Sequence, residues 1–227
     1  ESEWAAGTPK EINHLGYTGI ETQAIAGLTV HRLEPNLLIS DMSNYKVYYD
    51  LAFPDIAEGK RYTKETSGLA IAAYERTILA NQSPFQRWLN NEKNVMTSFY
   101  LEGALLFFGK GECNDCHNGP ALNSNEFHAL GMDDLGGFGI YGNVDNDVKQ
   151  GRGGFTKLDE DMYKFKVPQL YNLKDSPFYG HGSSIFSIKE VIEYKNEGIK
   201  ENQNIPDHQL SSDFKPLGLT DEEINLI

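Results

Sequence analysis

Apolar residues recur at helical spacing in five separate stretches of the chain. In the clearest one, which follows Thr63 and Thr66, they form one helix face through about residue 81. Shorter patterns predict four further helices, at Gly19–His31, Ser83–Leu89, Thr97–Phe108 and Ile188–Asn196. These patterns predict a mainly α-helical protein.

Three other stretches have no clear helical period. The aromatic-rich segment Tyr45–Phe53, which ends at Pro54, fits either a short helix or an extended strand. The glycine-rich stretch Gly119–Gly154 predicts a long loop of the kind that wraps a ligand. The segment Phe165–Asn172 predicts an extended passage around its proline.

The last residues carry a helix start. Thr220 and Glu223 have the spacing of a capping box, in which each side chain bonds the other residue's backbone N–H. The sequence ends soon after this signal, and it opens on Glu1 instead of a methionine. We therefore expect it to be a segment of a longer protein.

Charge and hydropathy exclude some classes of partner. The formal net charge of −13 disfavours nucleic acid and is compatible with a basic redox partner steered by charge. No apolar stretch approaches the ~20 residues that a membrane-spanning helix needs.

The strongest chemical signal is the C-x-x-C-H motif, Cys113–His117, which holds the only two cysteines of the chain. Two thiols three positions apart can form thioethers with the two vinyl groups of one haem. The histidine that follows can then ligate the iron. The motif predicts covalent haem c with Cys113 and Cys116 as anchors and His117 as axial ligand. Haem is attached to this motif outside the cytoplasmic membrane, so we expect a periplasmic or similar location.

Three other roles for the cysteines were weighed: a structural disulfide, half of a zinc site and a thioredoxin-like redox pair. A zinc site of this kind needs a second Cys or His pair at ligand spacing, and the sequence has none. A redox pair needs a βαβ context, which the pattern does not predict. Met132, in the glycine-rich loop, is an axial-ligand candidate by residue type, although a lone methionine is more often a core residue.

The order of several motifs resembles the bacterial di-haem cytochrome c peroxidase family, which includes the MauG-type enzymes. Its members have two class-I-like cytochrome c domains with one haem each. The resemblance rests on these stretches in order: Gly19–His31, Ala72–Leu79, Ser83–Phe85, Cys113–Pro120, Phe127–Gly131, Phe165–Asn172, Tyr179–Gly182 and Lys215–Glu223.

The resemblance implies the domain organisation. Residues 61–227 resemble the second, C-terminal domain: a class-I-like cytochrome c domain with long glycine-rich loops that carries the electron-transfer haem. Residues 1–60 resemble the connecting segment that covers the pocket of the first, peroxide-reacting haem. A second C-x-x-C-H motif is absent from this sequence, which is a large departure from the family.

The resemblance also implies catalytic residues in the connecting segment. Gln23 falls on the family's pocket glutamine. The family's pocket glutamate falls on Leu33, so Glu34, one residue away, and His31 are the candidates for that role. Trp4 is the candidate for the tryptophan that passes electrons between the haems.

Further haem contacts follow from the same comparison. In the family, the second axial ligand of this haem follows the histidine of the aromatic turn at a fixed spacing. Counted from His181, that spacing reaches Lys195, and Tyr194 is adjacent. Lysine would ligate iron as a neutral amine and tyrosine as a phenolate. The alternatives are Lys195, Tyr194 or neither. His181 and Tyr171 are further haem-binding candidates, and Tyr171 replaces a family arginine that can face a propionate.

The implied function is electron relay. The haem would accept electrons from a soluble donor, such as a small cytochrome or cupredoxin, and pass them to a second haem domain or subunit that reduces peroxide. The family also suggests calcium between the domains, and a homodimer is left open. The alternatives are a MauG-like or complex-bound haem oxidoreductase subunit and a non-catalytic electron carrier.

Overall fold

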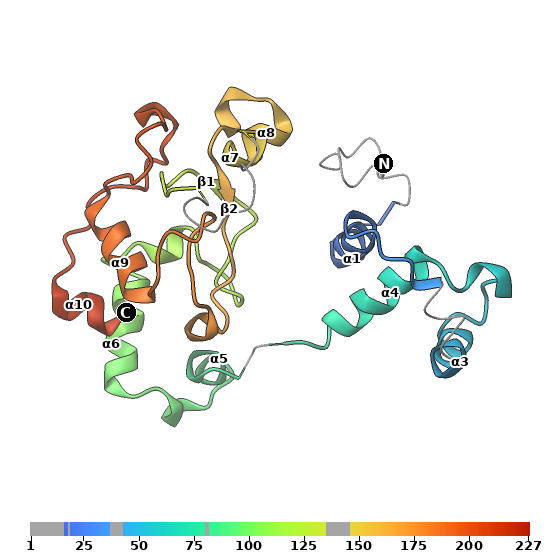
Figure 1. Cartoon of the computed structure of the whole chain (residues 1–227). Coiled ribbons are helices and arrows are strands. Elements are labelled where there is room, and N and C mark those ends of the chain that lie inside the picture. The colour runs from blue at the N-terminus through green and yellow to red at the C-terminus, as the bar shows by residue number, and fades with distance from the viewer. Residues whose placement is uncertain (1–15, 18, 37–42, 80–81, 135–145) are drawn as a thin grey trace. The chain divides into compact units, whose positions relative to one another are not determined.

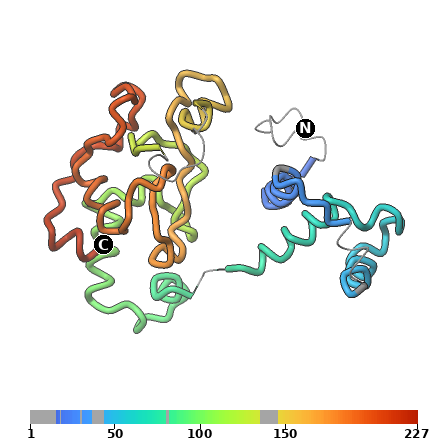
Figure 2. Tube along the Cα trace, viewed as in Figure 1, coloured from blue at the N-terminus to red at the C-terminus, as the bar shows by residue number. Residues whose placement is uncertain are grey.

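A computed structural model of the chain describes residues 16–17, 19–36, 43–79, 82–134 and 146–227. The chain forms two compact units, Glu1–Leu79 and Ala80–Ile227, which are treated separately below (Figures 1 and 2). Helix α4 (Lys64–Glu75) packs on α1 (Ile20–Val30) within the first unit, and the division into segments 1–60 and 61–227 stays a prediction. The roles assigned to the two segments remain predictions.

The first unit contains α1 (Ile20–Val30), α3 (Ser43–Ala52), a 3-10 turn (Glu58–Lys60) and α4 (Lys64–Glu75). The segment Tyr45–Phe53, which fitted either helix or strand, is therefore helical through Ala52. Helix α4 begins at Thr63, whose side chain accepts from the backbone N–H of Thr66 in a capping box.

Helices α1 and α4 form the core of this unit. Buried Ala24, Ile25 and Leu28 line α1, and Ala72 is buried on α4. A Cβ added at Gly68 of α4 would lie 2.3 Å from Cγ1 of Ile25. The absence of a side chain at Gly68 therefore sets how closely the two helices approach.

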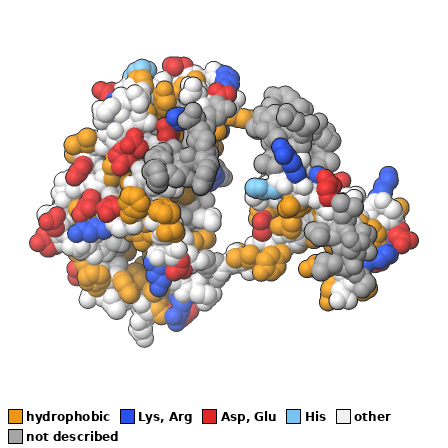
Figure 3. Space-filling model, in the orientation of Figure 1, with side chains coloured by type: hydrophobic (Ala, Val, Ile, Leu, Met, Phe, Trp, Pro, Cys, Tyr) orange, Lys and Arg blue, Asp and Glu red, His pale blue; other side chains and the backbone are white. Residues whose placement is uncertain are grey.

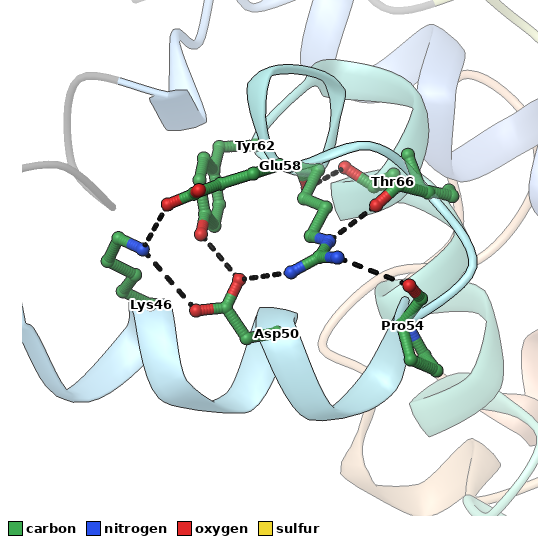
Figure 4. A network of polar contacts seen from close by, with 8 residues as sticks. Lys46, Asp50, Pro54, Glu58, Tyr62 and Thr66 are labelled. Atoms are coloured by element: carbon green, nitrogen blue, oxygen red, sulfur yellow. Dashed lines mark hydrogen bonds and ion pairs between the residues drawn. The ribbon is translucent and has the colours of Figure 1, made fainter.

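A polar network ties α3 to the turn before α4 (Figure 4). The Asp50 carboxylate accepts hydrogen bonds from the Tyr62 hydroxyl at 2.5 Å and from Arg61 at 3.0 Å. Lys46 pairs with Asp50 at 3.4 Å and with Glu58 at 3.0 Å. Arg61 also donates to two backbone carbonyl groups of this turn, so the turn is held to α3 by side chains.

The second unit is built from short helices and one small sheet. Its longer elements are α5 (Pro84–Leu89), α6 (Ser98–Phe107), α7 (Asn146–Lys149), α8 (Arg152–Thr156), α9 (Ile188–Glu197) and α10 (Asp221–Leu226), with strands β1 (Phe127–His128) and β2 (Phe165–Lys166). The strands pair antiparallel, with His128 opposite Phe165. Ser83, Thr97, Ser187 and Thr220 cap α5, α6, α9 and α10 through their side chains.

The sequence predicted α5, α6, α9 and the start of α10 within a residue or two, and the mainly helical fold is confirmed. The clearest pattern was expected to run to about residue 81, whereas α4 ends at Glu75. The stretch Gly119–Gly154, expected to be one long loop, contains β1, α7 and the start of α8 in its described part. These elements are too short to leave a period in the sequence.

The core of the second unit centres on Ile185, Tyr194 and Phe214. Met132 packs against this cluster, as a core methionine would. Among the described residues, no large side chain is less than 2% exposed, and apolar side chains are visible at the surface (Figure 3). A polypeptide of this size ordinarily buries most of its apolar surface, so this core is open.

None of the helices in the described ranges has the length and apolarity needed to cross a lipid bilayer.

Candidate haem-attachment site

The C-x-x-C-H motif folds into one tight turn after α6. Residues Cys113–Asp115 form a 3-10 helix, and the His117 N–H donates to the Cys113 carbonyl at 2.8 Å. Glu112, just before the turn, takes a left-handed conformation with φ 50° and redirects the chain. Both cysteines are partly buried and neither is in a disulfide. The turn therefore presents two unpaired thiols and an imidazole from adjacent positions.

The imidazole of His117 is held by its Nδ1 atom. Nδ1 lies 3.1 Å from the carbonyl oxygen of Leu122. A carbonyl can only accept, so Nδ1 carries the proton and Nε2 keeps its lone pair. Burial lowers the pKa of His117, against the opposing effect of hydrogen bonds with the backbone of Leu122 and Pro168. The ring is therefore neutral near pH 7, which is the state that can ligate iron.

Burial also shifts the pKa values of the two thiols. It raises the pKa of Cys113 to about 11, and it raises that of Cys116. The positive charge of Lys195 opposes both shifts. Two thiols outside any disulfide, an adjacent neutral imidazole and an open apolar core are what a covalently attached haem requires, so these residues fit that group.

The two candidate sixth ligands are adjacent on α9 but differ in environment. Tyr194 is 8% exposed, packs on Phe214 and donates its hydroxyl to the Leu130 carbonyl at 2.7 Å. Burial raises its pKa, which disfavours a phenolate. Lys195 is partly buried, and its Nζ donates to the backbone carbonyl of Asp213. Burial lowers the pKa of Lys195, against the attraction of nearby acidic groups and thiols.

The other two haem-binding candidates lie in the loops after β2. The imidazole of His181 stacks on Phe165, and its Nε2 lies 3.2 Å from the Asp134 carboxylate. Tyr171 is partly buried in the segment that precedes the 3-10 turn Leu173–Asp175. Their roles toward haem remain predictions.

The catalytic candidates Gln23 and Glu34 lie in the first unit. Gln23 is exposed on α1. Glu34 is exposed and forms an ion pair with Lys64 at 2.8 Å, and His31 is exposed at the end of α1. Trp4 lies outside the described residues. The structure places these candidates on a different compact unit from the C-x-x-C-H motif.

A polar hollow of about 600 Å³ lies beside the motif, and no sequence pattern predicted it. His128 of β1 and Asp213 lie close to Cys116: one ligand atom from each of the three falls within 4.8 Å of the others. Sequence reasoning noted His128 only as a loop residue and did not select Asp213. The hollow is lined by Asp115, Asn125, Glu126, Phe127, His128, Arg152, Asp161, Lys164 and Asp213.

Comparison with known families identifies the chain through a region that does not include the C-x-x-C-H motif. The model of the family described as di-haem cytochrome c peroxidase matches residues 18–94. This stretch covers α1 to α5 and ends before the cysteines. The family assignment and the haem motif are therefore separate observations.

Several curated proteins are similar over most of the chain. Cytochrome-c peroxidase IdrP1 of Denitromonas iodatirespirans is 31% identical over 200 residues, which cover 77% of this chain and 51% of the relative. The methylamine utilization protein MauG of Methylophilus methylotrophus is 26% identical over 220 residues, which cover 92% of this chain and 59% of the relative. The chain thus spans only about half the length of such relatives.

A solved structure supports the fold. The crystal structure of a MauG-like protein associated with microbial copper homeostasis superimposes with a TM-score of 0.70 and 24% identity, over 84% of this chain and 58% of that one. This likeness shows the fold alone. The family model and the curated relatives lead to one conclusion: the chain belongs to the di-haem cytochrome c peroxidase and MauG family.

Proposed function

We propose that this chain carries the electron-transfer haem of a di-haem peroxidase-like oxidoreductase and relays electrons to a second, peroxide-reducing haem. The observation that carries the proposal is the turn Cys113–His117, with two unpaired thiols and an imidazole fixed through Nδ1. Haem c would supply reversible one-electron chemistry at its iron. The protein's part is to anchor it, ligate it and exclude water from it.

Within this proposal, Cys113 and Cys116 anchor the haem and His117 is the proximal ligand. Lys195 is the preferred second ligand. Its Nζ contacts the backbone of Asp213, whose carboxylate lies beside Cys116, and burial favours its neutral amine. The Tyr194 hydroxyl, in contrast, is used within the core. Closed coordination suits a relay haem, because no position is left open for peroxide.

The second haem lies elsewhere in this proposal. The chain has one C-x-x-C-H motif and spans about half the length of its relatives. Another domain or subunit would supply the peroxide-reducing haem, and Gln23 and Glu34 would face its pocket. Electrons would come from a soluble donor, such as a small cytochrome or cupredoxin, outside the cytoplasmic membrane. Calcium between the domains and a homodimer belong to the same proposal.

A MauG-like activity is the second candidate. A relative that covers 92% of this chain is a MauG, and the superimposed structure is that of a MauG-like protein. In this case the electrons would come from protein side chains, which would be oxidised, instead of from a soluble donor. A non-catalytic electron carrier is the third candidate, because only one haem motif is present.

Haem counting tests the proposal. The chain is produced with c-type haem maturation and assayed by intact mass and pyridine haemochrome. We expect one covalent haem per chain and none in the Cys113→Ser, Cys116→Ser double variant. Absence of covalent haem from the unaltered chain would refute the proposal.

A peroxide assay separates relay from catalysis. The isolated one-haem chain, once reduced, should be oxidised slowly by peroxide. The full-length protein or its complex with the second haem should be oxidised rapidly. If the full-length protein carries one haem and peroxide leaves its spectrum unchanged, the electron-carrier alternative replaces the peroxidase relay.

A further inference from the structure

We propose that Cys116, His128 and Asp213 form a site for a divalent transition-metal ion, with Zn²⁺ as the fitting ion, in the chain before haem attachment. We further propose that metal binding and haem attachment at Cys116 exclude each other. The metal site stands on geometry alone. The exclusion rests on the proposed haem function.

The three ligand groups converge from distant parts of the sequence. Cys116 belongs to the haem-motif turn, His128 to β1 and Asp213 to the loop before α10. Their ligand atoms lie within 4.8 Å of one another, and His128 Nδ1 lies 4.0 Å from Asp213 Oδ2. Ligand atoms around tetrahedral zinc are about 3.5 Å apart. Closing the site therefore requires shifts of about 1 Å in partly buried side chains.

Metal-bound histidines commonly donate their second ring N–H to a carboxylate, and His128 has such a carboxylate beside its Nε2 atom. Nε2 lies 3.3 Å from the Glu126 carboxylate. A carboxylate at this position fixes the tautomer, leaves the Nδ1 lone pair for a metal and makes the imidazole a stronger ligand. Ser211 Oγ lies 3.1 Å from Nδ1 and 3.4 Å from Asp213 Oδ2. Its single proton can be donated to only one of these two acceptors at a time, and an ion between them would replace this contact.

The surroundings allow a cation to reach this site. His128 and Asp213 line the polar hollow of about 600 Å³, together with Asp115, Glu126 and Asp161. Of its two basic residues, Arg152 is paired with Asp161 at 3.1 Å. Carboxylates around an open hollow raise the local concentration of cations.

The donor set selects the class of metal. One thiolate, one imidazole and one carboxylate suit Zn²⁺ or Co²⁺, whereas Mg²⁺ and Ca²⁺ prefer oxygen ligands alone. The site differs from a paired C-x-x-C zinc site, because each ligand comes from a separate element.

Haem attachment removes the thiolate ligand. The S–H bond of Cys116 adds across a vinyl double bond of haem: an S–C bond forms and the hydrogen moves to the neighbouring carbon, so no oxidant is consumed. The resulting thioether cannot become a thiolate. His128 and Asp213 alone would then hold the ion weakly, which makes the site a property of the haem-free chain.

Cobalt titration tests the site. The full 227-residue chain is produced without haem maturation, reduced and titrated with Co²⁺. We expect one equivalent to bind, with a thiolate-to-cobalt band in the near ultraviolet and tetrahedral bands in the visible, and Zn²⁺ should displace it. Cys116→Ser, His128→Gln and Asp213→Asn should each weaken binding at least tenfold, and Glu126→Gln should weaken it about tenfold.

Cys113→Ser is the matched control, because the Cys113 thiol points to the Gly111 carbonyl at 3.4 Å and is not in the site. It should keep the cobalt spectrum, with far-ultraviolet circular dichroism confirming that all variants fold alike. Equal loss in Cys113→Ser and Cys116→Ser, or no thiolate band in the unaltered chain, would overturn the metal site. Unchanged binding in the Glu126→Gln variant would overturn the proposed orientation of His128.

A second assay tests the exclusion. Zn²⁺ added during haem attachment should slow the gain in intact mass, and the haem-bearing chain should give no thiolate-to-cobalt band. A chain that binds Co²⁺ but never gains haem would refute the proposed haem function and leave the metal site standing. A chain that gains haem at the same rate with and without bound Zn²⁺ would refute the exclusion alone.

Discussion

The imidazole of His181 lies flat on the ring of Phe165, with the ring centroids 3.6 Å apart and the planes 9° from parallel. Phe165 is on β2, opposite His128 of β1, so the small sheet supports the glycine-flanked turn that carries His181. The Asp134 carboxylate holds the ring from another side and also accepts from Asn202 at 3.3 Å. The His181 side chain is thus held by two segments, β2 through Phe165 and the stretch that carries Asp134.

Replacing Phe165 with leucine should therefore destabilise the second unit. Loss of the stacked pair is expected to lower the free energy of unfolding by about 1 kcal/mol, measured as a shift in the urea midpoint. Phe155→Leu is the control, because Phe155 is 49% exposed on α8 and its replacement should have little effect. Equal midpoints for the two variants would show that the stack contributes nothing.

Replacing His117 with glycine should change the iron's spectrum and leave the haem covalently attached. The thioethers depend on the two cysteines, whereas the axial bond depends on His117 Nε2. Intact mass measures whether the thioethers have formed, and the electronic spectrum reports on the bond between the histidine and the iron. Added imidazole should partly restore the original spectrum. His208→Gly, at an exposed position, is the control. An unaltered spectrum in His117→Gly would remove His117 from the ligand role.

The identity of the second ligand can be decided with two neighbouring variants. Lys195→Ala should change the spectrum of the oxidised haem. Tyr194→Phe should leave it unchanged but should cost about 1 kcal/mol of stability, because the partly buried Leu130 carbonyl loses its donor. The opposite pattern would assign the ligand to Tyr194. A weak far-red band typical of methionine ligation in the unaltered protein would exclude both residues.

Because α1 and α4 pack closely at Gly68, alanine substitutions at Gly68 and at Gly27 should change stability in opposite directions. Gly68→Ala should destabilise the first unit by about 1 to 3 kcal/mol, because the new methyl group overlaps Ile25. Gly27→Ala, in α1 with nothing within 4 Å of the added Cβ, should stabilise it by up to about 1 kcal/mol through helix propensity. Thermal unfolding followed by circular dichroism measures both. A Gly68→Ala variant as stable as Gly27→Ala would show that the helices can separate freely.

Glu223 predicts a dependence of stability on pH. Its pKa is lowered by the hydrogen bond from Lys110 and next by the backbone N–H of Thr220. A lowered pKa means that the ionised group stabilises the fold above the pKa of the unfolded chain, and that this contribution is lost as the pH falls through the folded pKa. The urea midpoints of the unaltered chain and Glu223→Gln should therefore differ at about pH 7 and converge towards about pH 3.

Glu222→Gln is the control for this experiment. Glu222 is exposed next to Glu223 in the same first turn of α10. The urea midpoint of Glu222→Gln should differ little from that of the unaltered chain at both pH values. A Glu223→Gln difference that stays constant with pH would show that the carboxylate charge is not what stabilises the helix start.

Local signals in the sequence were sufficient for most of the helices. Thr63, Ser83, Thr97 and Thr220 each stand where a helix begins, because a side-chain cap acts on the next three residues only. The C-x-x-C-H turn is equally local. The C-terminal end of α4 and the short elements after residue 119 were missed, since tertiary packing decides them and elements of two to five residues leave no period.

Long-range contacts account for what the sequence could not predict at the site. Asp213 lies in a loop with no distinguishing pattern, and only the fold brings it beside Cys116 and His128. The contrast between Tyr194 and Lys195 likewise depends on Leu130 and Asp213, which are remote in the sequence. Spacing rules detect ligands that are neighbours along the chain, and these residues are neighbours only in space.

The network around Asp50 has a consequence for how the family can vary. Its carboxylate accepts from Lys46, Arg61 and Tyr62 at once, so replacing it alone would weaken the hold on all three donors, although Lys46 keeps Glu58 and Arg61 keeps two backbone carbonyl groups. Replacing any one donor would leave the carboxylate with the other two. Among homologues, Asp50 should therefore change together with its partners, while each donor drifts singly. An alignment in which Asp50 varies independently of all three would show that the turn before α4 is held by other means.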